Sequence, residues 1–111
     1  MNRQELGRRS KSRGKQEERN VLKRLSQFFG EQFLRNPDSG FKIADVESPT
    51  RVVEVKSRQT KSYALLLTAW EQAEAAHIQT GKEPWIVLSF LDKGKRVRWL
   101  VTKLKDDNGT S

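Results

Sequence analysis

The tetrapeptide Val53-Glu54-Val55-Lys56 constrains the fold of this chain more than any other feature of its sequence. Alternation along a β-strand directs the two valines to one face and Glu54 and Lys56 to the other. A carboxylate and an ammonium group on an otherwise apolar strand carry a desolvation cost unless they are used. The tetrapeptide therefore predicts a strand with one apolar face and one chemically active face.

A second carboxylate, Asp45, closes the preceding strand-like segment 41–47. If the turn over 48–51 is a tight hairpin, Asp45 lies directly opposite Glu54. Two carboxylates that face each other across a strand pair repel. A divalent cation would remove this repulsion, and hard oxygen ligands with vacant positions suit Mg²⁺. We therefore predict a Mg²⁺ site formed by Asp45 and Glu54, with the backbone carbonyl of Val55 as a further ligand.

The charge balance points to a polyanionic partner. The chain has 111 residues, enough for one domain with a modest core, and its net charge is +8. Such a charge favours nucleic acid. No segment is apolar enough to span or anchor in a membrane. The absence of cysteine excludes disulfides and thiolate zinc sites. No secretory pattern opens the sequence, so we expect an intracellular setting, such as the cytoplasm, the nucleoid or a phage-infected cell.

The positive charge is concentrated near the N-terminus. Residues 1–16 carry six basic side chains against a single acid, Glu5, and contain two glycines. This composition predicts a flexible basic arm over residues 1–14, followed by one folded domain over 15–104 and a disordered tail over 105–111. Phosphate contact is the functional interpretation of the arm, and a solubilising tail is the alternative.

Apolar periodicity and turn residues predict an α/β fold. The predicted elements are a helix at 15–29, strands at 32–35, 41–47 and 51–57, a helix at 62–80, and strands at 85–91 and 96–101. The order α-β-β-β-α-β-β predicts a small mixed β-sheet flanked by helices.

The first predicted helix carries an acid on its apolar stripe. Glu18 lies near the middle of that stripe, whereas Glu17 lies at its margin. Acids at a helix N-terminus often face water, where they suit the helix dipole. An acid directed inward needs another explanation, so we predict that Glu18 is functional. Glu18, Asp45, Glu54 and Lys56 then form a set suited to phosphodiester hydrolysis, in which Lys56 orients the water nucleophile or stabilises developing charge.

Four motifs follow one another along the chain: Arg13-Gly14-Lys15-Gln16-Glu17-Glu18-Arg19, Arg35-Asn36-Pro37-Asp38-Ser39, Ile43-Ala44-Asp45-Val46 and Val53-Glu54-Val55-Lys56. In this order they resemble archaeal-type Holliday junction resolvases of the PD-(D/E)xK nuclease superfamily, over about residues 13–101. The resemblance implies a restriction-endonuclease-like fold and a Mg²⁺-dependent endonuclease, with Mn²⁺ as an alternative metal. It also implies a homodimer that resolves four-way DNA junctions by paired symmetric nicks.

The resemblance also implies roles for individual residues. Glu18 matches the active-site glutamate of the first helix and is a further candidate metal ligand. Asp45 and Glu54 match the metal-binding carboxylates, and Lys56 matches the catalytic lysine. With the basic arm, the expected DNA-binding residues are Arg8, Arg9, Lys11, Arg13, Lys15, Arg19, Arg35, Ser39 and Arg58.

Two alternatives remain open at this stage. One is another nuclease of the same superfamily, such as a nicking or repair enzyme, which would use the same residues. The other is a non-catalytic basic module that binds DNA or RNA. That module would explain the charge and the arm, but not the set formed by Asp45, Glu54 and Lys56. Roles in DNA recombination, DNA repair and phage packaging are all compatible with the sequence.

Overall fold

The structure, a computed structural model, describes the backbone of residues 3–36, 43–58 and 63–104 and the side chains of residues 15–36, 43–57 and 63–104. Its elements follow the predicted order. They are α1 (Arg3–Phe29), β1 (Leu34–Arg35), β2 (Val46–Glu47), β3 (Arg51–Arg58), α2 (Tyr63–Thr80), β4 (Glu83–Asp92) and β5 (Lys95–Val101).

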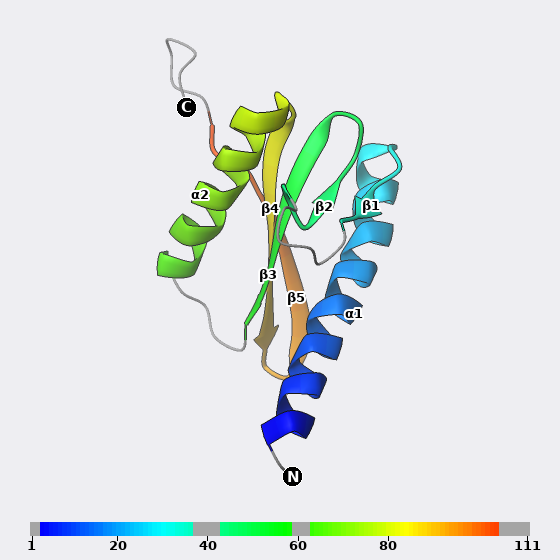
Figure 1. The fold of residues 1–111 in the computed structure, drawn as a ribbon, viewed down its shortest axis with the longest axis vertical. Helices are drawn as coiled ribbons and strands as arrows, with labels where there is room; N and C mark the ends of the chain where they lie inside the picture. Colours follow the sequence, from blue (N-terminus) through cyan, green and yellow to red (C-terminus); the bar gives the residue numbers. More distant parts are fainter. Residues whose placement is uncertain (1–2, 37–42, 59–62, 105–111) are drawn as a thin grey trace.

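The five strands form one mixed sheet in the order β1-β2-β3-β4-β5. Strands β3 and β4 are parallel, and every other neighbouring pair is antiparallel. Parallel strands require a crossover connection, and α2 supplies it between β3 and β4. The two helices lie on opposite faces of the sheet (Figure 1). The predicted α/β class and the mixed sheet flanked by helices are therefore confirmed.

Each helix covers its own apolar core. On one face, Val21 and Leu25 of α1 pack with Val53 and Val87 of the sheet. The core beneath α2 consists of Ala69, Ala73, Ile86, Leu88 and Phe90. Successive residues of β4 contribute to opposite cores, as the pleat of a strand requires. The alanines of α2 have short side chains, which allow this helix to pack closely on the sheet.

Both helices end where the sequence predicts, but the first helix begins earlier than predicted. Gly30 and Gly81 have φ angles of +70° and +72°, and each donates its N–H to a carbonyl of the preceding helical turn. Glycine adopts this left-handed conformation at low cost, so the predicted helix stops are confirmed. The first helix, however, begins at Arg3 and not at Lys15. The backbone of residues 3–14, predicted as a flexible arm, continues α1.

The strand predicted over 41–47 was too long, because β2 contains Val46 and Glu47 alone. Residues 43–45 lie outside the strand, and 41–42 lie outside the described residues. Two side chains hydrogen-bond to the backbone groups here. Asn36 donates its side-chain amide to the Ala44 carbonyl, and the Asp45 carboxylate accepts the Val55 N–H. The predicted tail 105–111 also lies outside the described residues. Within the described chain, neither helix combines the length and the apolar character needed to cross a bilayer.

Candidate functional site

A tight hairpin joins β2 to β3 and sets the position of the two predicted metal ligands. The Ser48 N–H donates to the Arg51 carbonyl at 2.9 Å, and the register pairs Val46 with Val53. The paired register ends at Val46, so Asp45 lies just before β2, and its carboxylate is held at β3 by the N–H of Val55, the residue after Glu54. The predicted tight hairpin is therefore confirmed, and Asp45 lies beside the strand that carries Glu54.

The segment that follows α1 braces this hairpin through Glu31. Glu31 accepts hydrogen bonds from the hydroxyls of Ser48 and Thr50 and forms a 2.6 Å ion pair with Arg51. The Thr50 hydrogen bond, helped by Arg51 and Ser48, outweighs the effect of desolvation and lowers the pKa of Glu31 below its ordinary value. One carboxylate thus satisfies three donors of the turn and fixes the strand register that follows it.

Both predicted carboxylate ligands are buried. Asp45 is 7% exposed and Glu54 is 6% exposed. The Val55 N–H donates to Asp45 Oδ2 at 2.8 Å and orients that carboxylate. In a strand, the N–H and C=O of one residue point to the same neighbouring strand. The Val55 carbonyl, the third predicted metal ligand, therefore points to the same side of β3 as Asp45.

Glu54 and Lys56 share the α2 face of the sheet. Their partners across the parallel register are Ile86 and Leu88, which pack beneath α2. The valines at 53 and 55 pack beneath α1, so the alternation predicted from the tetrapeptide is confirmed. The Lys56 side chain is half-buried, and no hydrogen bond or ion pair engages it within the described residues. A half-buried ammonium group on the same face as a buried carboxylate can act on a bound anion.

Glu18, a predicted active-site residue, forms an ion pair with a strand residue. Its Oε2 accepts a hydrogen bond from Arg35 Nε at 2.6 Å, and both side chains are partly buried. Arg35 lies opposite Val46 in the β1–β2 register, so the ion pair lies on the β1–β2 side of α1. Among the described residues, no group of three acidic or histidine side chains is placed to hold a metal ion. The role of Glu18 as a metal ligand stays a prediction.

Glu17, which the sequence reasoning set aside, is buried more deeply than Glu18. It is 7% exposed and forms a bidentate ion pair with Arg98 of β5, with N–O distances of 2.9 and 2.8 Å. Burial raises the pKa of Glu17, but Arg98, helped by Ser89 and Arg96, outweighs burial and lowers the pKa below its ordinary value. Spacing offered a signal, because Val21 and Leu25, the most buried residues of the stripe, follow Glu17 at intervals of four.

The predicted DNA-binding residues are only partly described. The side chains of Lys15 and Arg19 are exposed on α1, whereas Arg35 is half-buried in its pair with Glu18. Four further basic residues lie on the helical backbone of α1, but their side chains are outside the described part: Arg8, Arg9, Lys11 and Arg13. Ser39 and the side chain of Arg58 are also outside it.

The donor set at the hairpin fits Mg²⁺. Proteins usually hold this ion through one or two carboxylates and leave the remaining positions to water and substrate phosphate. Asp45 and Glu54 would supply the carboxylates, and the Val55 carbonyl is directed to the same side. All of these donors are oxygens, which Mg²⁺ and Mn²⁺ prefer to nitrogen or sulfur.

Comparison of the chain with protein-family models, curated proteins and solved structures found no match.

Proposed function

We propose that this chain is a metal-dependent endodeoxyribonuclease with a restriction-endonuclease-like fold, which resolves four-way DNA junctions by paired symmetric nicks. The observation that carries the proposal is the pair of buried carboxylates beside the hairpin, where the Val55 N–H holds Asp45 at β3 and Lys56 shares a sheet face with Glu54. Burial of two carboxylates has a desolvation cost that a bound cation would offset.

The residues divide the chemistry between them. Asp45 and Glu54 would hold Mg²⁺ or Mn²⁺, and the Val55 N–H keeps Asp45 in a fixed orientation. When bound, the metal supplies positive charge at the attacked phosphate and lowers the pKa of a coordinated water. Lys56 donates to a phosphate oxygen or orients the attacking water. Glu18 acts indirectly, because its pair with Arg35 fixes β1 beside the segment that carries Asp45.

Junction resolution requires two cuts in opposed strands. One chain offers a single set of Asp45, Glu54 and Lys56, so two symmetric cuts require a second copy. A twofold homodimer would supply two equivalent sites. The net charge of +8 supports binding to the phosphates of branched DNA. Shape more than base sequence would guide recognition.

The first test is cleavage of a labelled synthetic four-way junction with Mg²⁺ or Mn²⁺, beside linear duplex, flap and single-strand substrates. Paired symmetric nicks confined to the junction would support the full proposal. Equal cutting of all substrates would retain the nuclease and remove the junction preference.

Variants separate catalysis from binding. Lys56→Ala should abolish cleavage and leave junction binding nearly unchanged, whereas Lys103→Ala, an exposed lysine outside the sheet, should keep both. Binding without cleavage by the wild-type chain in either metal would favour the alternative, a non-catalytic nucleic-acid-binding module. The basic composition gives that module its support.

A further inference from the structure

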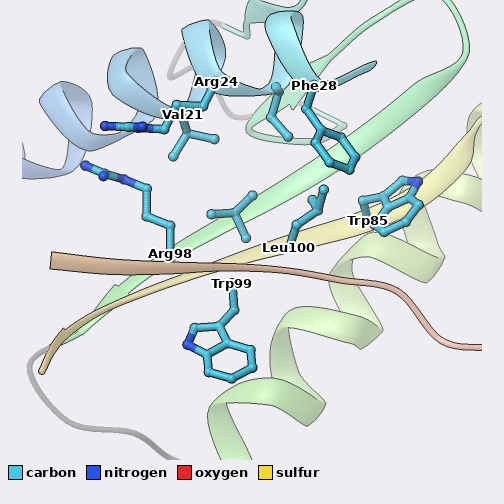
Figure 2. A pocket seen from close by; sticks show the side chains of 9 residues that line it. Val21, Arg24, Phe28, Trp85, Arg98, Trp99 and Leu100 are labelled. Carbon is cyan, nitrogen blue, oxygen red and sulfur yellow. The ribbon is translucent and has the colours of Figure 1, made fainter.

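A cleft on the α1 face of the sheet combines an apolar interior with a cationic end. It lies between α1 and strands β4 and β5, and its volume is about 450 Å³. Its lining includes Val21, Leu25, Val87 and Leu100, together with Phe28 and Trp85. Figure 2 shows the two aromatic rings at one end of this cleft and the guanidinium groups of Arg24 and Arg98 at the other.

A second hollow adjoins the cationic end. It has a volume of about 330 Å³ and shares Arg24 and Arg98 with the cleft. Its other lining residues are Arg19, Asn20, Lys23 and Gln27. Arg98 is paired with Glu17, but the exposed side chains of Arg19, Lys23 and Arg24 have no ion-pair partner within the described part of the chain. Three uncompensated cations around one hollow form a site for an anion.

The aromatic end exposes more apolar surface than a helix normally leaves in water. Phe28 is 71% exposed, although its ring edge contacts Phe29, which in turn contacts Trp85. Phe28 therefore stands at the mouth of the cleft with one face of its ring uncovered. A planar aromatic partner would cover this ring by stacking.

We propose that the cleft binds an unpaired nucleotide of a polynucleotide strand. The base stacks against Phe28 beside Trp85, and the phosphate lies at the end formed by Arg24, Lys23 and Arg19. A second copy of this chain is disfavoured as the occupant, because it would bring further positive charge against the three cations. Paired bases within a duplex do not expose their faces, so the site selects single-stranded segments.

This proposal does not depend on the cleavage proposed above. The cleft lies on the α1 face of the sheet, whereas Glu54 and Lys56 lie on the α2 face. Binding can therefore be measured in EDTA, where no metal-dependent cleavage occurs. Loss of the nuclease proposal would leave this prediction intact, and the reverse also holds.

The test measures the affinity of labelled oligo(dT), oligo(rU) and an abasic strand of the same length by fluorescence anisotropy. Phe28→Ala should weaken binding of a base-bearing strand by about fivefold or more and leave binding of the abasic strand unchanged. Phe28→Tyr retains a stacking ring and should restore the affinity. Arg24→Ala should weaken binding of base-bearing and abasic strands alike, because it removes a phosphate contact.

Matched controls and opposing outcomes complete the design. Leu104→Ala removes another exposed apolar side chain, away from the cleft, and should change no affinity. We compare the loss of affinity in Phe28→Ala for oligo(dT) and for oligo(rU). The larger loss identifies whether the site binds DNA or RNA. Equal binding of abasic and base-bearing strands by the wild-type chain would overturn the proposal. The Phe28→Ala substitution could instead change the sedimentation of the free protein and leave every strand affinity unchanged. That result would assign the cleft to a second copy of the chain.

Discussion

The α1–β5 contact and the β2–β3 hairpin both contain buried carboxylates, but the surroundings of these carboxylates differ. In the first, the Glu17 carboxylate receives two hydrogen bonds from one guanidinium group, that of Arg98. In the second, the buried carboxylates of Asp45 and Glu54 flank the Val55 backbone, Asp45 through a hydrogen bond and Glu54 as the preceding residue. The first arrangement links two distant elements of the fold. The second gathers two buried carboxylates at one place, where a bound cation would bring opposite charge, and it is therefore the better candidate for chemistry.

The largest expected effect comes from removing one charge at the hairpin. Glu54→Gln should reduce metal-dependent cleavage by about a hundredfold or more, because it removes one of two metal ligands. Its free energy of unfolding without metal should stay within about 1 kcal/mol of the wild-type value, because glutamine keeps the size of glutamate and its capacity for hydrogen bonds. Cleavage kinetics and urea denaturation measure the two quantities.

Glu47→Gln is the matched control for this change. Glu47 lies on the same hairpin, where it forms an ion pair with Lys82 at 2.6 Å, so the substitution removes the same charge from a neighbouring position. It should leave cleavage close to the wild-type rate. Equal losses in both variants would mean that the hairpin acts through its structure and not through a metal site.

The next largest effect concerns the stability of the α1–β5 contact. Arg98→Ala should lower the free energy of unfolding by about 2 kcal/mol, because it leaves the Glu17 carboxylate buried without its guanidinium partner. Lys95→Ala, an exposed change on the same strand, should have little effect. Similar losses in the two variants would show that Arg98 acts as an ordinary strand residue.

The pH dependence of stability sharpens the same comparison. The ordinary pKa of a glutamate is 4.5, and that of Glu17 is lowered in the folded chain despite burial, through Arg98. A lowered folded pKa contributes stability above the unfolded value, and this stability is lost as pH falls through the folded value. The stability difference between the wild-type chain and Glu17→Gln should therefore be full near neutrality and shrink below about pH 4.5. A difference that stays constant down to about pH 3 would contradict this linkage.

The smallest effect tests the brace of the hairpin. Glu31→Gln keeps the shape of the side chain but weakens its bonds to Thr50 and Arg51, so the free energy of unfolding should fall by less than in Arg98→Ala. Cleavage should fall by a smaller factor than in Glu54→Gln, because the register loosens without losing a ligand. A loss of cleavage as large as that of Glu54→Gln would place Glu31 in the site itself.

Local sequence patterns were sufficient for the elements and the hairpin of this fold. The valine and glutamate alternation of β3 predicted both faces, and the tight turn predicted the hairpin that pairs β2 with β3. The length of β2 was not predictable in this way. At its start, the Asn36 amide donates to a backbone carbonyl and the Asp45 carboxylate accepts a backbone N–H, and apolar periodicity does not report such contacts.

The roles of the two helix acids show where sequence reasoning stops. Glu17 and Glu18 are neighbours in the chain, and each finds its arginine in a different part of the fold. A small error in the position of the apolar stripe was enough to favour Glu18 as the inward acid. The partner of Glu17 is 81 residues away, so its burial depends on a contact that local periodicity does not report.

The separation of Glu17 and Arg98 also has a consequence for synthesis of the chain. Glu17 leaves the ribosome early, whereas its partner is 81 residues further along the chain. Until β5 has been made, α1 cannot pack against the sheet without placing an unpaired carboxylate in the core. The helix should therefore remain solvated during most of translation, and the α1 face of the sheet should close last. Ribosome-bound chains that stop before β5 should leave α1 open to protease and to any nucleic acid nearby.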